Sequence, residues 1–561
     1  MNMNEWWRRS VVYQIYPKSF NDTMGNGTGD IQGIIEKLDY LKDLGVDVIW
    51  LTPIYSSPQK DNGYDISDYY SIHSEYGTMD DFDKLLEEAH KKDLKIIMDI
   101  VVNHTSTEHQ WFKEAAVSKD SPYRDYYIWK DPVDGEEPTN WQSKFGGSAW
   151  ELDEKTGQYY LHLFDVTQAD LNWENEKVRE DVYEMMNYWF EKGVDGFRLD
   201  VINLISKDQA FPNDNGATPH GDGRKFYTDG PRVHEFMKEM NRNVFSQYDV
   251  LTVGEMSSTT VDHCIKYTRP DRNELSMTFN FHHLKVDYEN GEKWSKTPFD
   301  FQALKNILTK WQVEMHKGGG WNALFWCNHD QPRVVSRYGN DEDYHKESAK
   351  MLATTIHLMQ GTPYIYQGEE FGMTNPHFNS IEDYRDVETL NIFNQLKEEG
   401  MAEEDILQII QEKSRDNSRT PVQWDDTKNG GFTTGTPWIP VANNYTEVNA
   451  KVAQADQDSI YYHYKKLIQM RKELDIVTFG NFELLLEDDP DLFVYVRQYQ
   501  KEKLLVINNF YEKEVTCSLP SHHFEKKCVE LLLSNYNDSP TVEKNMTIRP
   551  YESLVYHLKE A

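Results

Sequence analysis

Eight short apolar runs, separated by longer segments with helical spacing, constrain the fold of this 561-residue chain more than any other feature. Apolar runs of this length between turn residues predict buried β-strands. The runs are VVYQIYP (11–17), VDVIWLTP (46–53), LKIIMDIVVNH (94–104), VDGFRLDVI (194–202), VLTVGEM (250–256), SMTFNF (276–281), NALFWCNHD (322–330) and PYIYQGEE (363–370). Strands that alternate with helices predict parallel pairing, and eight repeats predict an α/β fold of the (β/α)8 TIM-barrel type.

The remaining segments predict two smaller domains. Residues 105–171 are rich in Trp, Tyr, Gly and Asp without a clear helical pattern, so we expect a small domain inserted after strand 3 at the barrel mouth. In residues 480–561, short alternating runs such as LFVYVRQY follow one another without helices, which predicts a C-terminal antiparallel β-sandwich domain. The catalytic barrel is then expected in residues 1–104 and 172–479.

The charge balance excludes some partners. Lys and Arg number 59 against 94 Asp and Glu, a net charge of −35 that repels nucleic acid and anionic membranes. The four cysteines, Cys264, Cys327, Cys517 and Cys528, share no metal-ligand spacing, so we expect reduced thiols. The chain starts without an apolar signal core and has no run of about 18 apolar residues. These features predict a cytoplasmic protein with a small-molecule substrate.

Polar side chains gather at the ends of the predicted strands, where TIM barrels carry their active sites. They are Asn103, His104, Arg198, Asp200, Glu255, His329 and Asp330. The carboxylates of Asp200, Glu255 and Asp330 are suited to glycoside hydrolysis, which needs an ionised nucleophile and a protonated acid. Arg198 shares a strand face with Asp200, so we expect it to keep Asp200 ionised. Burial is expected to keep Glu255 protonated.

Four segments in this order resemble the conserved regions of glycoside hydrolase family 13, the α-amylase family. They are DIVVNH (99–104), GFRLDVIN (196–203), VGEM (253–256) and NHD (328–330). QADLNW (168–173) and GTPYIYQGEE (361–370) resemble the oligo-1,6-glucosidase branch, and the resemblance extends over essentially the whole chain. In this retaining family the positions of Asp200, Glu255 and Asp330 are the nucleophile, the general acid/base and the transition-state stabiliser.

The resemblance also implies a pocket for one terminal glucose. The matching positions are Asp61, Tyr64, His104, Phe164, Gln168, Arg198, His329 and Arg419. Asp61 is expected to pair with Arg419, while Tyr64 stacks on the sugar. Such a pairing closes the pocket at one end and therefore implies an exo-acting enzyme.

The segment MTFNFHHLKVDYENGEKW (277–294) carries an unusual group of basic residues, namely His282, His283, Lys285 and Lys293. In so acidic a chain, such a group favours an anionic substrate. This segment, with GEMSSTTVDHC (254–264) and GGGWNALFWCNHDQPRVVSRYG (318–339), resembles the phospho-α-(1,1)-glucosidases of the family. The resemblance implies hydrolysis of α,α-trehalose 6-phosphate to glucose and glucose 6-phosphate, with the phosphate near the basic group.

Three alternatives differ in substrate or in class. An oligo-1,6-glucosidase that uses neutral isomalto-oligosaccharides has the same machinery, and Val201 matches the residue associated with α-1,6 or other non-1,4 linkages. A glucosyl-transferring isomerase retains both products of the cleavage. A non-catalytic relative, such as a transporter-subunit ectodomain, is expected to lack the catalytic acids, which this sequence carries.

The resemblance implies no cofactor for catalysis and a structural calcium at NDTMGNGTGD (21–30). The candidate ligands are Asp22, Asn26, the Thr28 carbonyl and Asp30. Met24 stands at a usual ligand position, and Asn26 replaces the usual aspartate. We therefore expect weak calcium binding or none.

Overall fold

All eight predicted runs fold as strands of one sheet. They are β1 (Val12–Ile15), β2 (Val48–Leu51), β5 (Lys95–Val101), β11 (Gly196–Asp200), β12 (Leu251–Glu255), β13 (Met277–Phe279), β14 (Ala323–Leu324) and β15 (Thr362–Tyr366). Their order is β13-β12-β11-β5-β2-β1-β15-β14, the cyclic order of a (β/α)8 barrel opened between its sixth and seventh strands. The prediction of a TIM barrel is therefore confirmed.

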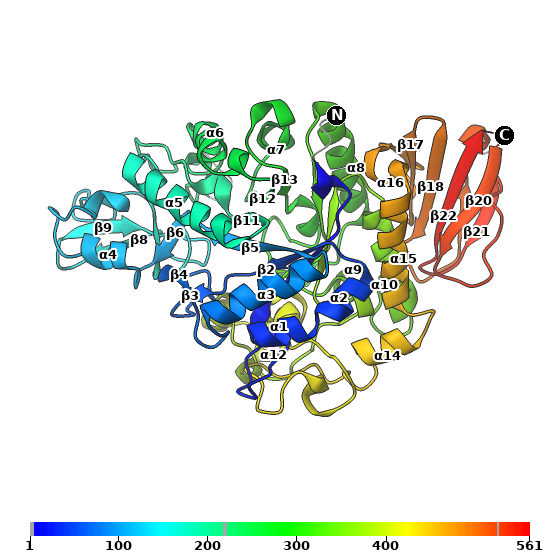
Figure 1. Cartoon of the computed structure of the whole chain (residues 1–561), viewed down its shortest axis with the longest axis horizontal. Coiled ribbons are helices and arrows are strands. Elements are labelled where there is room, and N and C mark those ends of the chain that lie inside the picture. Colours follow the sequence, from blue (N-terminus) through cyan, green and yellow to red (C-terminus); the bar gives the residue numbers. More distant parts are fainter. Residues whose placement is uncertain (1–4, 217–220, 524–526, 561) are drawn as a thin grey trace. The chain divides into compact units, whose positions relative to one another are not determined.

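The computed structural model describes residues 5–216, 221–523 and 527–560 (Figure 1). The chain forms two compact units, each with most of its residue contacts inside itself. Unit 1 comprises residues 1–49, 92–94 and 282–561, and unit 2 comprises residues 50–91 and 95–281. The boundaries expected for the barrel, the inserted domain and the C-terminal domain stay predictions.

Parallel strands form the centre of unit 2. Gly196 of β11 pairs with Ile97 of β5 on one side and with Leu251 of β12 on the other. This close approach requires glycine, because a Cβ at position 196 would lie 2.1 Å from the Leu251 carbonyl oxygen. All five residues of β11 are buried, so Arg198 and Asp200 are held inside the protein.

Helices connect the strands of unit 2. They are α3 (Met79–Lys91), α5 (Glu176–Lys192), α6 (Val233–Asn243) and α7 (Val261–Thr268). The side chain of Asn175 caps the start of α5 by accepting from the Lys177 N–H, and Gly193 ends the helix with φ 106°. The chain then turns directly into β11.

The segment inserted after β5 is small, mostly extended and rich in aromatic contacts. Its strands are β6 (His104–Ser106), β7 (Trp129–Lys130), β8 (Trp150–Asp153), β9 (Gln158–Leu161) and β10 (Gln168–Asp170). β6 pairs with β10, and β7, β9 and β8 form a three-stranded sheet. One short helix, α4 (Gln110–Ala115), was not predicted. Trp141 and Trp150 share a core with Leu204, so the inserted segment packs against the chain that follows Asp200.

Unit 1 contains β1, β14 and β15 together with most of the remaining helices. These are α1 (Ile31–Glu36), α2 (Leu38–Leu44), α8 (Phe301–Gly318), α9 (Val334–Tyr338), α10 (His345–His357), α11 (Val387–Glu398), α12 (Glu403–Lys413), α13 (Asp416–Arg419), α14 (Ala450–Ala455), α15 (Ile460–Glu473) and α16 (Asp475–Phe479). β15 pairs in parallel with both β1 and β14. α11 and α12 follow the eighth strand, β15.

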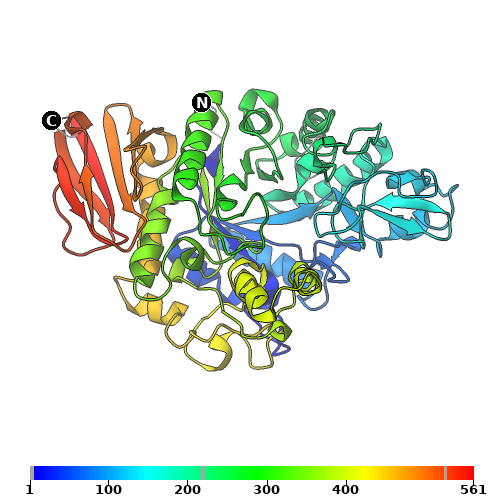
Figure 2. The ribbon, with the colours of Figure 1, turned by 180° about the vertical axis from the view of Figure 1, so that it is seen from behind.

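The last strands of unit 1 are antiparallel, as predicted. They are β16 (Asn481–Leu485), β17 (Leu492–Tyr499), β18 (Glu502–Asn509), β19 (Val515–Ser518), β20 (Lys527–Ser534), β21 (Asn545–Ile548) and β22 (Ser553–Glu560). β16, β17, β18, β22 and β20 form one sheet, and β19 pairs with β21. Figures 1 and 2 show the orange and red strands side by side. Val494, Leu505 and Tyr556 lie in their shared core.

Two further expectations concern membranes and cysteines. In the part of the chain that the structure describes, no helix combines the length and the apolar character needed to cross a bilayer. All four cysteines are free thiols, of which only Cys528 is exposed.

Candidate active site

One guanidinium gathers three carboxylates from neighbouring strands in unit 2. Arg198 Nη1 donates to Asp200 Oδ1 at 2.6 Å, and Nη2 donates to Glu255 Oε2 at 2.5 Å. Nη1 also donates to Asp99 Oδ1 at 2.8 Å. Because a single rigid group contacts both, Asp200 and Glu255 lie a few ångström apart, and retaining glycosidases separate their two acids by about 5 Å. The structure thus brings these two predicted residues together.

The residue after Asp200 has an unusual backbone. Val201 has φ 36° and ψ 38°, a left-handed conformation that is rare for a β-branched residue and is typically retained at functional sites. Its N–H donates to Glu255 Oε2 at 3.2 Å. The turn that leaves the β11 strand is therefore bonded directly to the second acid.

Burial decides the protonation of this cluster. Burial raises the pKa of Asp200 well above its ordinary value; Arg198 lowers this pKa, and the neighbouring Glu255 raises it. Burial also raises the pKa of Asp99, to about 6, although Arg198 and Tyr64 oppose the rise. Arg198 therefore acts on the Asp200 pKa in the predicted direction, but burial and Glu255 outweigh it, so whether Asp200 is ionised stays a prediction. One guanidinium among three buried carboxylates favours a proton shared by Asp200 and Glu255.

Four more predicted residues form a chain of contacts in unit 2. Gln168 Nε2 donates to Asp61 Oδ2 at 3.1 Å and lies 3.2 Å from His104 Nε2. The ring centroids of Phe164 and His104 are 5.2 Å apart. Burial lowers the pKa of His104 to about 4, so its imidazole is neutral at physiological pH. A neutral ring next to an amide and a carboxylate is suited to binding sugar hydroxyls.

Tyr64 connects this chain with the carboxylate cluster. Its hydroxyl donates to Asp99 Oδ2 at 2.9 Å, and its backbone N–H donates to the Asp61 carbonyl. The Arg198 guanidinium lies 5.8 Å from the Tyr64 ring centroid. Unit 2 therefore assembles every predicted site residue that it contains.

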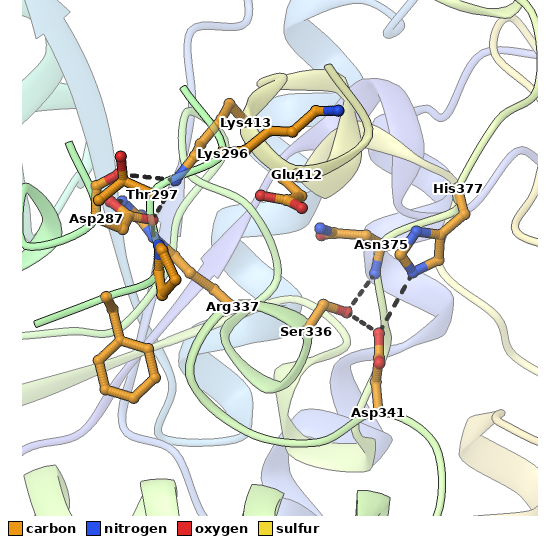
Figure 3. A pocket seen from close by; sticks show the side chains of 12 residues that line it. Asp287, Lys296, Thr297, Ser336, Arg337, Asp341, Asn375, His377, Glu412 and Lys413 are labelled. Atoms are coloured by element: carbon orange, nitrogen blue, oxygen red, sulfur yellow. Dashed lines mark hydrogen bonds and ion pairs between the residues drawn. The ribbon is translucent and has the colours of Figure 1, made fainter. Parts of the chain in front are cut away.

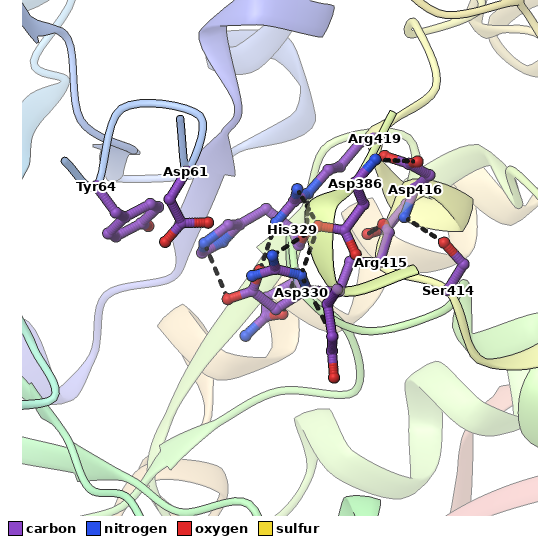
Figure 4. A network of polar contacts seen from close by, with 12 residues as sticks. Asp61, Tyr64, His329, Asp330, Asp386, Ser414, Arg415, Asp416 and Arg419 are labelled. Carbon is purple, nitrogen blue, oxygen red and sulfur yellow. Dashed lines mark hydrogen bonds and ion pairs between the residues drawn. The ribbon is translucent and has the colours of Figure 1, made fainter. Parts of the chain in front are cut away.

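Unit 1 holds His329, Asp330 and Arg419 in one polar network (Figure 4). Gln14 Nε2 donates to His329 Nδ1 at 2.8 Å, and Tyr16 stacks on the His329 ring. Arg419 Nη2 donates to Asp330 Oδ1 at 2.7 Å, while Nε donates to the His329 carbonyl at 2.8 Å. His329, Asp330 and Arg419 are therefore held together. The predicted pairing of Asp61 with Arg419 joins residues of different units and stays a prediction.

Two residues of this network were not predicted as site residues. Arg415 Nη2 donates to Asp386 Oδ1 at 2.6 Å, and Nη1 donates to Asp330 Oδ1 at 3.3 Å. Burial raises the pKa of Asp386, but Arg415 and Arg419 lower it more, so the net shift is downward and Asp386 is ionised. Asp386 in turn orients both arginines. The only sequence signal for these residues was the density of charge after the eighth strand.

The basic residues proposed to bind phosphate have different surroundings. Lys293 Nζ donates to Glu388 Oε2 at 2.8 Å and lies 4.5 Å from the Trp294 ring centroid. Lys285 is exposed. His282 is half-buried beside Trp311.

His283 differs from the other three. It is buried, and its Nε2 donates to the Phe325 carbonyl at 2.8 Å. Burial lowers the pKa of this imidazole to about 4, so it is neutral. A buried neutral ring that already has a backbone partner is a poor ligand for phosphate, and we leave His283 out of the proposal below.

A cavity of about 400 Å³ lies next to the segment that carries Lys285 (Figure 3). On its wall, Asp287 accepts from Lys413 at 2.7 Å and from Arg337 at 2.7 and 2.9 Å. Arg337 also donates to the Leu284 carbonyl. Leu284, directly before Lys285, and Asp287, two residues after it, are therefore anchored, which limits where the Lys285 side chain can reach.

The predicted calcium loop uses its carboxylates for backbone contacts. Asp22 accepts from the N–H groups of Met24, Gly25 and Gly27 at 2.7 to 2.9 Å. Asp30 accepts from the Thr23 N–H at 2.7 Å, and Asn26 accepts from the Thr28 N–H at 2.9 Å. In the described ranges, no cluster of three or more His, Cys, Asp or Glu side chains is arranged to hold a metal ion. Asp22, Asn26 and Asp30 therefore stabilise the loop by accepting from its own N–H groups, and weak calcium binding or none stays a prediction.

Comparison with known proteins identifies the family. Residues 14–480 match the family described as "Alpha amylase, catalytic domain". The chain belongs to the α-amylase family of glycoside hydrolases. Residues 492–555 match the "Alpha-amylase SusG C-terminal domain". Enzymes of the α-amylase family need no cofactor for catalysis.

Three members of the α-amylase family are similar over nearly the full length. Trehalose-6-phosphate hydrolase of Bacillus subtilis is 70% identical over 555 residues, which cover 99% of this chain and 98% of that protein. Oligo-1,6-glucosidase of Parageobacillus thermoglucosidasius is 56% identical, with 99% of each covered. The crystal structure of Bacillus licheniformis trehalose-6-phosphate hydrolase has a TM-score of 0.96 and 67% identity, covering 99% of this chain and all of that one.

Proposed function

We propose that the chain is a retaining, exo-acting α-glucosidase that hydrolyses α,α-trehalose 6-phosphate to glucose and glucose 6-phosphate. The main support for double displacement is that the Arg198 guanidinium contacts both Asp200 and Glu255, which places the two acids close together. The full-length similarity to trehalose-6-phosphate hydrolases supports the choice of substrate. The basic residues after β13 support a substrate with an anionic group.

In the first step, an Asp200 oxygen attacks the anomeric carbon of the unphosphorylated glucose. The bond from this carbon to the glycosidic oxygen breaks, and Glu255 gives its proton to that oxygen as glucose 6-phosphate leaves. In the second step, Glu255 removes a proton from water, and the water oxygen displaces Asp200. Two inversions retain the α configuration of the released glucose. The proton shared by the free acids must therefore reside on Glu255 when the substrate is bound.

Asp330 is the proposed stabiliser of the transition state. We propose that its carboxylate binds hydroxyls of the reacting glucose more tightly as the sugar ring flattens. Because this interaction is strongest in the transition state, it lowers the activation barrier. Arg419 and Arg415 hold its Oδ1 at 2.7 and 3.3 Å and so restrict its rotation. Asp61, Tyr64, His104, Phe164, Gln168 and His329 are proposed to hold the terminal glucose.

The phosphate is proposed to contact Lys285 and Lys293, with His282 as a further donor. Ionic hydrogen bonds to phosphate oxygens are strong when the cation is partly shielded from water. Lys293 is partly shielded, and its present partner is the Glu388 carboxylate. Phosphate would compete with Glu388 for this ammonium. We further propose a cytoplasmic location, where sugar phosphates formed on import are found.

Turnover of three disaccharides tests the substrate. Trehalose 6-phosphate, trehalose and isomaltose are supplied at equal concentration, and released glucose is measured. The proposal expects the highest kcat/KM for trehalose 6-phosphate. A preference for isomaltose would replace the proposal with an oligo-1,6-glucosidase, which the similarity to that group and Val201 favour as second candidate. Rearranged disaccharides among the products would indicate a glucosyl-transferring isomerase.

A further inference from the structure

The turn after Asp200 is bonded to the end of the neighbouring strand at a second point. This turn is η4 (Ile202–Leu204), and its Asn203 is fully buried. Asn203 Oδ1 accepts from the Ser257 N–H at 2.9 Å, and Nδ2 donates to the Ser257 carbonyl at 2.8 Å. The Asn203 amide thus forms with Ser257 the pair of hydrogen bonds that the backbone of a neighbouring strand forms within a sheet. Ser257 lies two residues after Glu255.

Asp229 fixes the orientation of the Asn203 amide. Asn203 Nδ2 donates to Asp229 Oδ1 at 3.2 Å, and the Asp229 N–H donates to the Asn203 carbonyl at 2.9 Å. If the amide were flipped, its oxygen would face the Asp229 carboxylate, which is repulsive. Asp229 is itself held by the hydroxyls of Tyr267 at 2.7 Å and Thr259 at 2.9 Å. The amide therefore has one favourable orientation, the one that holds Ser257.

We infer that Asn203 and Asp229 are positioning residues for the acid/base Glu255. Asn203 belongs to the turn that leaves the nucleophile strand, and it holds the backbone that leaves the acid/base strand. Together with the Val201 contact to the Glu255 carboxylate, it fixes Glu255 relative to Asp200 at two points. Neither residue contacts the reacting atoms. Proton transfer depends steeply on such geometry, so a small displacement of Glu255 slows the step that needs its proton.

Leaving-group dependence tests this inference. Trehalose 6-phosphate and isomaltose release a sugar that needs a proton, whereas α-glucosyl fluoride releases fluoride without one. For Asn203→Ala and Asp229→Asn we expect kcat on the disaccharides to fall by roughly 10- to 100-fold at nearly constant KM, with the first-turnover release of fluoride changed less than about 3-fold. Fluoride release is followed in the first turnover because the second step also uses Glu255, as the base for water. Asn187→Ala, which removes another amide contact to the backbone in unit 2, is the matched control and is expected to change neither rate.

Equal losses on both donor types, or no loss on either, would overturn the inference. Asn203→Asp keeps the side-chain shape and is expected to give the same pattern if Asn203→Ala fails to fold. Failure of every variant to fold would assign the contact to folding and would also overturn it. The inference rests on the proposed role of Glu255. If Glu255→Gln slows the disaccharides and the fluoride donor equally, the proposed function fails. If Glu255→Gln slows mainly the disaccharides but the Asn203 and Asp229 variants do not, this inference alone fails.

Discussion

The backbone N–H of Val201 donates to Oε2 of Glu255 at 3.2 Å, in the turn directly after the proposed nucleophile. Arg198 donates to the same oxygen at 2.5 Å. Two donors on Oε2 stabilise a negative charge there, so Oε1 is the oxygen suited to carry the transferable proton. This asymmetry distinguishes the two oxygens of the acid before any substrate is bound.

Replacing Glu255 by Gln removes that proton. We expect kcat/KM for trehalose 6-phosphate to fall by about 10²- to 10⁴-fold, the usual contribution of general acid catalysis. α-Glucosyl fluoride is expected to glucosylate Asp200 still, because fluoride leaves without protonation. Stopped-flow measurement of fluoride release checks this, with azide added to accept the glucosyl group. Equal losses on both donors would contradict the role of Glu255.

The raised pKa of Asp200 predicts an acid limit to activity. Burial raises the pKa of Asp200 and the neighbouring Glu255 raises it further, so Asp200 keeps its proton to a higher pH than an ordinary aspartate, which loses it near a pH of about 3.9. As the pH falls through this raised pKa, the nucleophile gains a proton and kcat/KM falls. In Glu255→Gln the charge of Glu255 is removed, so with α-glucosyl fluoride as donor this acid decline is expected to move to lower pH. A decline that persists unchanged would assign it to another group.

Lys285→Ala tests the phosphate contact. We expect KM for trehalose 6-phosphate to rise by the equivalent of roughly 1.5 to 3 kcal/mol of lost charge-assisted binding, with isomaltose little affected. Lys285→Arg keeps the charge and serves as the control, with a smaller effect expected. Steady-state kinetics on both sugars provide the comparison. The same increase in KM for both sugars would rule out phosphate recognition by Lys285.

A buried carboxyl outside the candidate site predicts pH-dependent stability. Glu370 accepts from Tyr13 at 2.8 Å and from Tyr40 at 2.7 Å, and burial raises its pKa to about 7. The unfolded chain has an ordinary glutamate pKa of about 4.3. The folded state therefore holds this proton more tightly, and its stabilising contribution is complete below the unfolded pKa. It is lost as the pH rises from about 4.3 through 7, by a few kcal/mol at most.

Glu370→Gln is expected to remove this contribution to the pH dependence. Thermal unfolding near about pH 5 and pH 8 is measured for the wild type, for this variant and for Glu398→Gln, an exposed control. The fall in Tm between the two pH values is expected to shrink in Glu370→Gln only. An unchanged fall would show that Glu370 is not the group that titrates.

The sequence predicted the barrel because its strands are short, apolar and separated by turn residues, and all eight runs became strands. It also predicted the pair Asp200 and Glu255, since both stand at strand ends where parallel strands converge. Asp99 was part of a quoted motif but was interpreted only as a strand residue. Its role as a third carboxylate on Arg198 depends on pairing between β5 and β11, which spacing along one strand does not show.

Other site residues have no periodic signal. Asp386 and Arg415 come from irregular chain and helix ends after the eighth strand, and only the folded structure brings them to Asp330. The upward shift of the Asp200 pKa was also not predicted. Spacing placed Arg198 beside Asp200, but the strength of desolvation and the sharing of Arg198 among three acids depend on burial.

The anomeric form of the first glucose released from trehalose 6-phosphate tests double displacement by Asp200 and Glu255 most directly. Proton NMR during the first minutes of the reaction distinguishes α-glucose from β-glucose before mutarotation mixes them. Two inversions at one carbon predict α-glucose as the first product, with β-glucose appearing only later. Initial release of β-glucose, or no cleavage of this substrate, would contradict the account.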